Sequence, residues 1–118
     1  MTDFTSQGSV VRDGLGLIEL SGEVDLYTAP RFKDELIALV DDGVVNVVID
    51  LSQVTFIDST ALGVLVSGAK RVRPRNGNLD IVCSDENIIR IFEITGLAEI
   101  FTVCATRDEA IAALGGAA

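Results

Sequence analysis

The stretch "VVNVVIDLS", residues 44–52, constrains the fold of this chain more than any other feature. It is a nearly unbroken run of β-branched residues, which favour extended backbone. Because neighbouring side chains in a strand point to opposite faces of a sheet, a strand that is apolar at successive positions must be covered on both faces. We therefore expect this run to form the central strand of a sheet that carries helices.

Upstream of this run, the sequence predicts a hairpin followed by a helix. Strands are expected at about residues 4–12 and 15–21, because two apolar stretches flank the pair Asp13-Gly14, which favours tight hairpin turns. Farther along, in "EVDLYTAPRFKDELIALVDDG", residues 23–43, apolar residues recur at spacings of three, four and seven, a pattern that is typical of an amphipathic helix. We expect this helix to have Thr28 as its N-cap and to end at Gly43.

Downstream, a second amphipathic helix is predicted for "STALGVLVSGAKRV", residues 59–72. Pro74 closes it, because proline cannot continue a helix. Projection at 3.6 residues per turn separates an apolar stripe that faces inward from a second stripe of residues that faces outward. The residues expected to face inward are Leu62, Leu65, Val66 and Ala69.

Helices and strands continue to alternate toward the end of the chain. "LDIVCS" and "IFTVCA" predict strands, and "DENIIRIFEITGL" between them predicts a helix that Asp85 caps and Gly96 ends. "TRDEAIAAL" predicts a last helix with a capping box formed by Thr106 and Glu109. We expect the final "GGAA" to be a frayed tail.

The predicted order of elements is β-β-α-β-α-β-α-β-α, which indicates an α/β fold. About five strands form a mixed sheet with about four helices, and the later strands are parallel and joined by right-handed helical crossovers. We expect residues 1–118 to form one domain, because 48% hydrophobic residues suffice to bury a single core. Its ordered core is expected at about residues 4–114, followed by a short C-terminal tail.

The charge balance argues against nucleic acid and membrane partners. Eighteen acidic and nine basic residues give a formal net charge of −9, which repels phosphate groups and anionic lipid. Cations do gather in "KRVRPR", but this segment follows a helix whose negative dipole end they offset. No apolar stretch reaches the roughly 20 residues that span a bilayer, and the start lacks the features of a secretory signal. We expect a cytoplasmic protein.

The composition also disfavours an enzyme or a metal protein. The chain contains no histidine, which removes the commonest general base and metal ligand. Cys83 and Cys104 lie in apolar runs without a second cysteine at metal-ligand spacing, so we expect buried, inert thiols. There is no G-x-x-x-x-G-K-[ST] phosphate loop. The sequence predicts no enzymatic activity, no cofactor and no metal.

Polar residues gather where the central run meets the next helix, and in open α/β sheets function collects at such junctions. Either Asp58 or Ser59 can cap the helix, and a capping hydroxyl also remains open to modification. A nucleophilic Ser59 is disfavoured, because no histidine and no G-x-S-x-G motif is present to activate it. The junction holds more polar residues than one cap requires, namely Ser52, Thr55, Asp58, Ser59 and Thr60.

Three segments resemble STAS-domain anti-sigma factor antagonists: "GEVDLYTAPRFKDEL", "VVIDLSQVTFIDSTALGVLV" and "IIRIFEITGLAEIFTV". The resemblance covers nearly the whole chain, and its sharpest element is D-S-[ST]-x-L-G after an apolar strand. It implies a protein that binds an anti-sigma factor with serine kinase activity and so frees a sigma factor to start transcription. Such switches operate in stress response and sporulation.

The resemblance also implies the residues of the switch. The kinase would phosphorylate Ser59, the residue after Asp58, and complex formation would be lost until a serine phosphatase restores it. Asp25 matches the family's acidic residue near the phosphorylation site, although from the residues alone an Asx-type turn explains it equally well. Family members often have Ser-Gly where this chain has Thr60-Ala61, so Thr60 is a second, less favoured acceptor.

The outer stripe of the same helix is a candidate platform for the partner. The projection places Thr60, Val64 and Ser67 outward, with Gly63 beside them, so that small residues surround one valine. Our partner-binding hypothesis therefore comprises Asp25, Asp58, Ser59, Thr60, Gly63, Val64 and Ser67.

Other functions remain open at the level of the residues. The main alternative is a STAS module that is not phosphorylated and that scaffolds a signalling or transport complex. A phosphorylated aspartate, Asp50 or Asp58, would need the acidic pair and the late lysine of response-regulator receivers, and neither is present. A nucleotide-binding protein is disfavoured by the missing phosphate loop.

Overall fold

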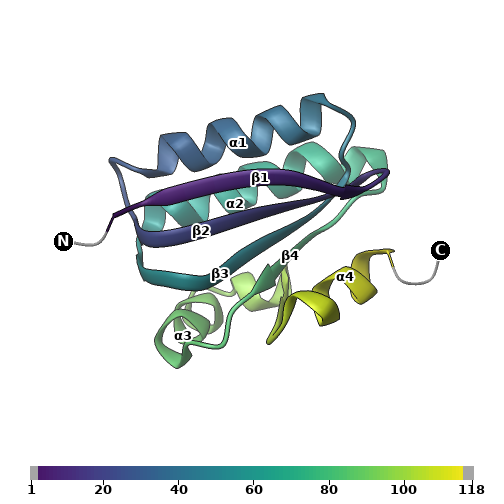
Figure 1. The fold of residues 1–118 in the computed structure, drawn as a ribbon. Helices are drawn as coiled ribbons and strands as arrows, with labels where there is room; N and C mark the ends of the chain where they lie inside the picture. Colours follow the sequence, from purple (N-terminus) through teal and green to yellow (C-terminus); the bar gives the residue numbers. More distant parts are fainter. Residues whose placement is uncertain (1–2, 116–118) are drawn as a thin grey trace.

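The run that dominates the sequence forms the middle strand of a five-stranded sheet with the order β1-β2-β3-β4-β5 (Figure 1). A computed structural model describes residues 3–115; the predicted "GGAA" tail lies largely outside them. β1 and β2 form the predicted antiparallel hairpin, and β2 to β5 are parallel. The strands are β1 (Thr5–Arg12), β2 (Leu15–Val24), β3 (Asn46–Ile57), β4 (Leu79–Val82) and β5 (Thr102–Cys104).

The helices cover the two faces of the sheet unequally. α1 and α2 lie side by side (Figure 1), and their buried residues share one large core with those of α3. The opposite face has a smaller core, in which Ala110 of α4 packs against strand residues such as Leu17 and Val48. The helices are α1 (Ala29–Asp41), α2 (Ser59–Val72), α3 (Glu86–Ile94) and α4 (Arg107–Gly115).

Most of the predicted ends and turns are confirmed. Asp85 caps α3 by accepting hydrogen bonds from the N–H groups at 87 and 88, and Gly96 follows in a left-handed conformation with φ 79°. In the predicted capping box, the Glu109 N–H donates to Thr106 Oγ1 at 3.2 Å. The Glu109 carboxylate accepts from the N–H of Ala105, one residue earlier than the box requires.

Both cysteines are buried free thiols, as predicted, and burial raises the pKa of each thiol. Among residues 3–115, no helix combines the length and the apolarity needed to cross a membrane.

β3 continues to Ile57, beyond the predicted run, which ends at Ser52, and it contains two irregularities. Its pairing with β2 shifts between Asp50 and Gln53 and again between Val54 and Phe56, so that each shift adds one residue to β3. An unbroken strand would turn Gln53 and Thr55 toward the large core, because the side-chain period of a strand is two. The extra residues act as β-bulges and change that spacing to three. The β3 residues in the large core are Val47, Ile49, Leu51, Val54 and Ile57.

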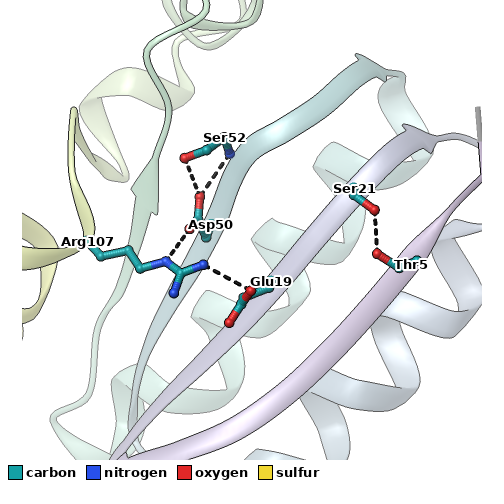
Figure 2. Close-up of polar contacts among 6 residues, drawn as sticks. All are labelled: Thr5, Glu19, Ser21, Asp50, Ser52 and Arg107. Carbon is teal, nitrogen blue, oxygen red and sulfur yellow. Dashed lines mark hydrogen bonds and ion pairs between the residues drawn. The ribbon is translucent and has the colours of Figure 1, made fainter.

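Arg107 joins the first bulge to α4, as Figure 2 shows. Its guanidinium, at the first residue of α4, pairs with Asp50 and lies 3.0 Å from Glu19 on the neighbouring strand. Asp50 also accepts hydrogen bonds from the N–H and hydroxyl of Ser52. Burial alone would raise the pKa of the Asp50 carboxyl, but the bonds from Ser52 and Arg107 outweigh burial and lower it. Asp50 therefore serves the fold as a charged, satisfied carboxylate.

A second buried carboxylate, Asp80 in β4, has no such partners. It is 3% exposed, and within the described residues its Oδ2 makes no hydrogen bond. Burial raises the pKa of this carboxyl from 3.8 to about 6. The unfolded chain therefore releases the proton at lower pH than the folded protein does, so ionisation of Asp80 destabilises the fold as the pH rises from about 4 to about 6.

Replacement of Asp80 by asparagine should remove this penalty. At pH 7.5 we expect the free energy of unfolding of Asp80→Asn to exceed that of the native protein by about 1–2 kcal/mol, since one pKa unit corresponds to about 1.4 kcal/mol. The gain should shrink as the pH falls from about 6 to about 4 and vanish only below about pH 3, where the carboxyl is protonated in both states. Urea unfolding across this pH range measures it, with Asp34→Asn on the exposed face of α1 as the control. A gain that does not depend on pH would contradict the assignment.

Candidate functional site

The carboxylate of Asp58 ties the start of α2 to the loop between β2 and α1. Asp58 is extended and directly precedes α2, and its Oδ1 accepts hydrogen bonds from the N–H groups of Thr60 and Ala61, at 2.9 and 3.2 Å. Its Oδ2 accepts a third bond, at 3.1 Å, from the N–H of Leu26 in that loop. Asp58 is thus the N-cap of α2, which decides between the two caps that the sequence allowed.

Asp25 forms the turn that the residue pattern suggested. Its Oδ1 accepts hydrogen bonds from the N–H groups of Tyr27 and Thr28, at 2.9 and 3.1 Å, which is an Asx-type turn. Thr28 occupies the N-cap position of α1, but its side chain caps no helix N–H, contrary to the prediction. Its hydroxyl instead accepts from the Asp25 N–H and donates to the Glu23 carbonyl. The turn at Asp25 brings these two backbone groups close to the Thr28 hydroxyl.

The two candidate acceptor hydroxyls lie in different surroundings. Ser59 is the first residue of α2 and is exposed, and within residues 3–115 its hydroxyl makes no hydrogen bond. Thr60 is only partly exposed and lines a hollow between α1 and α2. Since Asp58 does the capping, the Ser59 hydroxyl is free to be modified without loss of the cap.

The predicted outer stripe of α2 borders this hollow, which has a volume of about 400 Å³. Gly63 is exposed and Ser67 partly exposed, but Val64 is only 8% exposed and belongs to the large core, so its predicted outward position is wrong. The projection assumed one covered face, whereas α2 is covered both by the sheet and by α1. The hollow is lined by Ala29, Pro30, Lys33, Thr60, Gly63, Val64 and Ser67.

The residues of α2 that face inward also differ from the prediction, because α1 as well as the sheet covers this helix. Leu65 and Ala69 are buried as predicted, but Leu62 and Val66 are only partly buried. Gly68 packs closely against α1, since an added Cβ at this position would lie 2.5 Å from Leu36 Cδ2. The buried residues of α2 are Ala61, Val64, Leu65, Gly68, Ala69 and Val72.

Leu26 and Tyr27 are surface residues of the site that the sequence analysis missed. Their side chains are 62% and 86% exposed, although both are large and apolar. Their N–H groups are held by Asp58 and Asp25 respectively, so two carboxylates fix this pair beside the start of α2. Two consecutive apolar residues in a loop between a strand and a helix were the available signal. Exposed apolar residues of this kind are typical of protein-binding surfaces.

This arrangement suits recognition and modification by another protein. No histidine is present to activate Ser59, and both aspartates accept backbone N–H bonds. Within residues 3–115 there is also no group of three or more potential ligands that could hold a metal ion. The site therefore combines an exposed hydroxyl, two fixed negative charges and an exposed apolar pair.

Comparison with known proteins identifies the family. The model of the STAS domain matches residues 9–110. An anti-sigma-B factor antagonist of Listeria monocytogenes is 41% identical over 87 residues, which are 73% of this chain and 75% of that protein.

The fold is also that of solved antagonists. The crystal structure of an anti-sigma factor antagonist from Mycobacterium paratuberculosis is similar with a TM-score of 0.85 and 30% identity, over 95% of this chain and 94% of that one. The Bacillus cell fate determinant SpoIIAA in its phosphorylated form has a TM-score of 0.73 at 19% identity, over 91% and 96% of the two chains, which is a likeness of fold alone.

Removal of the Asp58 carboxylate should cost more than the loss of a helix cap. Asp85 is a matched control, because it caps α3 with the same two-bond geometry but, within residues 3–115, accepts no bond from a distant loop. We expect Asp85→Ala to lower the free energy of unfolding by about 1 kcal/mol, and Asp58→Ala by about 2 kcal/mol, since the Leu26 bond is lost as well. Urea denaturation measures both. Equal losses would show that the bond to the loop contributes nothing.

Proposed function

The chain belongs to the STAS-domain family of anti-sigma factor antagonists, and from this premise we propose that Ser59 switches its binding to an anti-sigma factor. In its unmodified form the protein binds an anti-sigma factor that is also a serine kinase, and so releases a sigma factor in the cytoplasm. The kinase then phosphorylates Ser59, the complex dissociates, and a serine phosphatase resets the switch.

The observation that supports this proposal most strongly is the separation of cap and hydroxyl at the start of α2. Asp58 satisfies the N–H groups of Thr60 and Ala61, whereas the neighbouring Ser59 is exposed. A kinase can reach this hydroxyl without opening the helix. Thr60 is half-covered in the hollow, which favours Ser59 as the acceptor.

The effect of the phosphate should lie at the partner surface. A phosphoserine carries about −1.5 to −2 charges, which are favourable near the positive end of a helix dipole, so the fold should persist. The added charge stands beside Asp58 and close to the exposed pair of Leu26 and Tyr27. An apolar partner surface would then have to desolvate the phosphate in order to bind that pair, and acidic partner groups would be repelled.

The partner surface that we propose joins the loop to the exposed part of α2. It comprises Leu26 and Tyr27 together with Asp25, Asp58, Ser59, Thr60, Gly63 and Ser67, and Val64 supports it from below.

Phosphorylation should be confined to Ser59. We expect the cognate kinase and ATP to modify the native protein and Thr60→Ala, and to leave Ser59→Ala unmodified, because only the exposed hydroxyl is accessible. Mass spectrometry of the peptide that contains "FIDSTALG" identifies the modified residue. Modification of Ser59→Ala at Thr60 would contradict the assignment, and absence of modification in the native protein by every serine kinase of its cell would favour an unphosphorylated scaffold.

An acidic residue at position 59 should weaken partner binding without unfolding the protein. We expect Ser59→Asp to keep the native melting temperature within about 2 °C, since the charge lies at a helix amino terminus, and to bind the anti-sigma factor at least about tenfold more weakly. Calorimetry and scanning fluorimetry measure the two quantities. Ser84→Asp, an exposed serine beside the capping Asp85, is the matched control and should bind normally. A large loss of stability in Ser59→Asp would show that the charge acts on the fold.

A further inference from the structure

The edge of the sheet at β5 is open. β5 is the last strand in the order, and within residues 3–115 only β4 pairs with it. The Cys104 carbonyl accepts from the Cys83 N–H on the β4 side. Because successive residues of a strand point their N–H and C=O groups to opposite sides, the N–H and C=O of Val103 face the open edge. This edge offers one unpaired donor and one unpaired acceptor in strand geometry.

The N–H groups two residues before and two residues after Val103 already have acceptors. The Phe101 N–H donates to the Leu97 carbonyl, and the Ala105 N–H donates to the Glu109 carboxylate. The open N–H of Val103 is therefore flanked by two N–H groups that already have acceptors, so an added strand would be centred on Val103.

A groove runs along this edge and gives an added strand a floor. It has a volume of about 600 Å³ and is lined by every residue from Ile100 to Ala105, by Cys83 at the end of β4, and by Ile89 and Glu93 of α3. Of the aliphatic residues that line the groove, Ile100 is 44% exposed and Ile89 is partly exposed. The groove thus combines an open strand edge with uncovered aliphatic surface, the two features that bind extended peptides.

The charge around the groove selects the occupant. Glu93 and Glu99 both line it, and the carboxylate of Glu109 lies at the Ala105 end. Arg73 donates to the Ile100 carbonyl at the opposite end, and Arg90 follows Ile89 in α3. Three carboxylates favour a peptide with lysine or arginine and repel nucleic acid. A second copy of this chain is disfavoured, since it would bring another charge of −9 to the same place.

We propose that this groove, the β5 groove, binds an extended segment of another protein in which basic residues alternate with apolar ones. The segment adds to the sheet as a sixth strand, with backbone hydrogen bonds to Val103, apolar side chains over Ile89 and Ile100, and basic side chains paired with Glu93 and Glu99. This surface involves neither Ser59 nor the hollow between α1 and α2, so it serves a contact separate from the phosphorylation switch.

The proposal can be tested with the blocked pentapeptide VKVRV and nitrogen-edited NMR spectra of the native protein. At peptide concentrations up to about 1 mM, the amide resonance of Val103 should shift downfield and its hydrogen exchange should slow, because the N–H enters a hydrogen bond. The acidic peptide VEVEV and a VKVRV peptide with a methylated backbone should bind at least about tenfold more weakly. No shift at Val103, or equal binding of either control peptide, would overturn the proposal.

Variants of the groove separate its two contributions. Charge reversal by Glu93→Lys with Glu99→Lys should weaken VKVRV at least about tenfold, whereas Asp34→Lys on α1 should leave binding unchanged. Val103→Pro removes the outward N–H while an edge strand still tolerates proline, so it should abolish binding. If that variant unfolds, the charge reversal still decides the outcome. Self-association of the native protein that Val103→Pro abolishes would overturn the proposal in favour of a second copy.

Discussion

The arrangement of the site depends on the three hydrogen bonds that the Asp58 carboxylate accepts. Two of them cap the start of α2, and the third holds Leu26 in the loop that leads to α1. Asp25 continues the same construction by fixing Tyr27. Because backbone N–H groups satisfy both carboxylates, their negative charges stay in place beside the surface, and the exposed hydroxyl and apolar pair keep fixed positions relative to each other.

This use of the aspartates changes the meaning of the serine motif. The sequence allowed Ser59 to be both the helix cap and the phosphate acceptor, whereas in the structure Asp58 is the cap and the Ser59 hydroxyl is exposed. A phosphate on Ser59 would therefore add to an existing cap. For that reason we expect the switch to alter which proteins can bind while the domain itself stays folded.

Patterns along the sequence predicted the fold well where the residues of a segment themselves determine its structure. The β-branched run became the central strand because a strand that is apolar at successive positions must be covered on both faces. Asp85 capped α3 because capping depends on nearby residues alone. Val64 was misplaced because its burial depends on α1, a helix far away in sequence. The exposure of Tyr27 was likewise not visible, since an apolar loop residue can equally turn into the core. The predicted helical spacing of α2 was right, but the prediction did not include the contact with α1 that buries Val64.

The two bulges of β3 make the connection between core and site depend on chain length. Each extra residue reverses which side of the sheet the following residues face, and the two reversals cancel, so Ile57 enters the core and Asp58 meets α2 in register. Substitution of the exposed Gln53 or Thr55 leaves that count intact. Deletion of either residue, by contrast, would turn the "FIDST" segment toward the opposite face of the sheet. Relatives that keep this site should therefore vary at the exposed positions of residues 52–56 while conserving the number of residues.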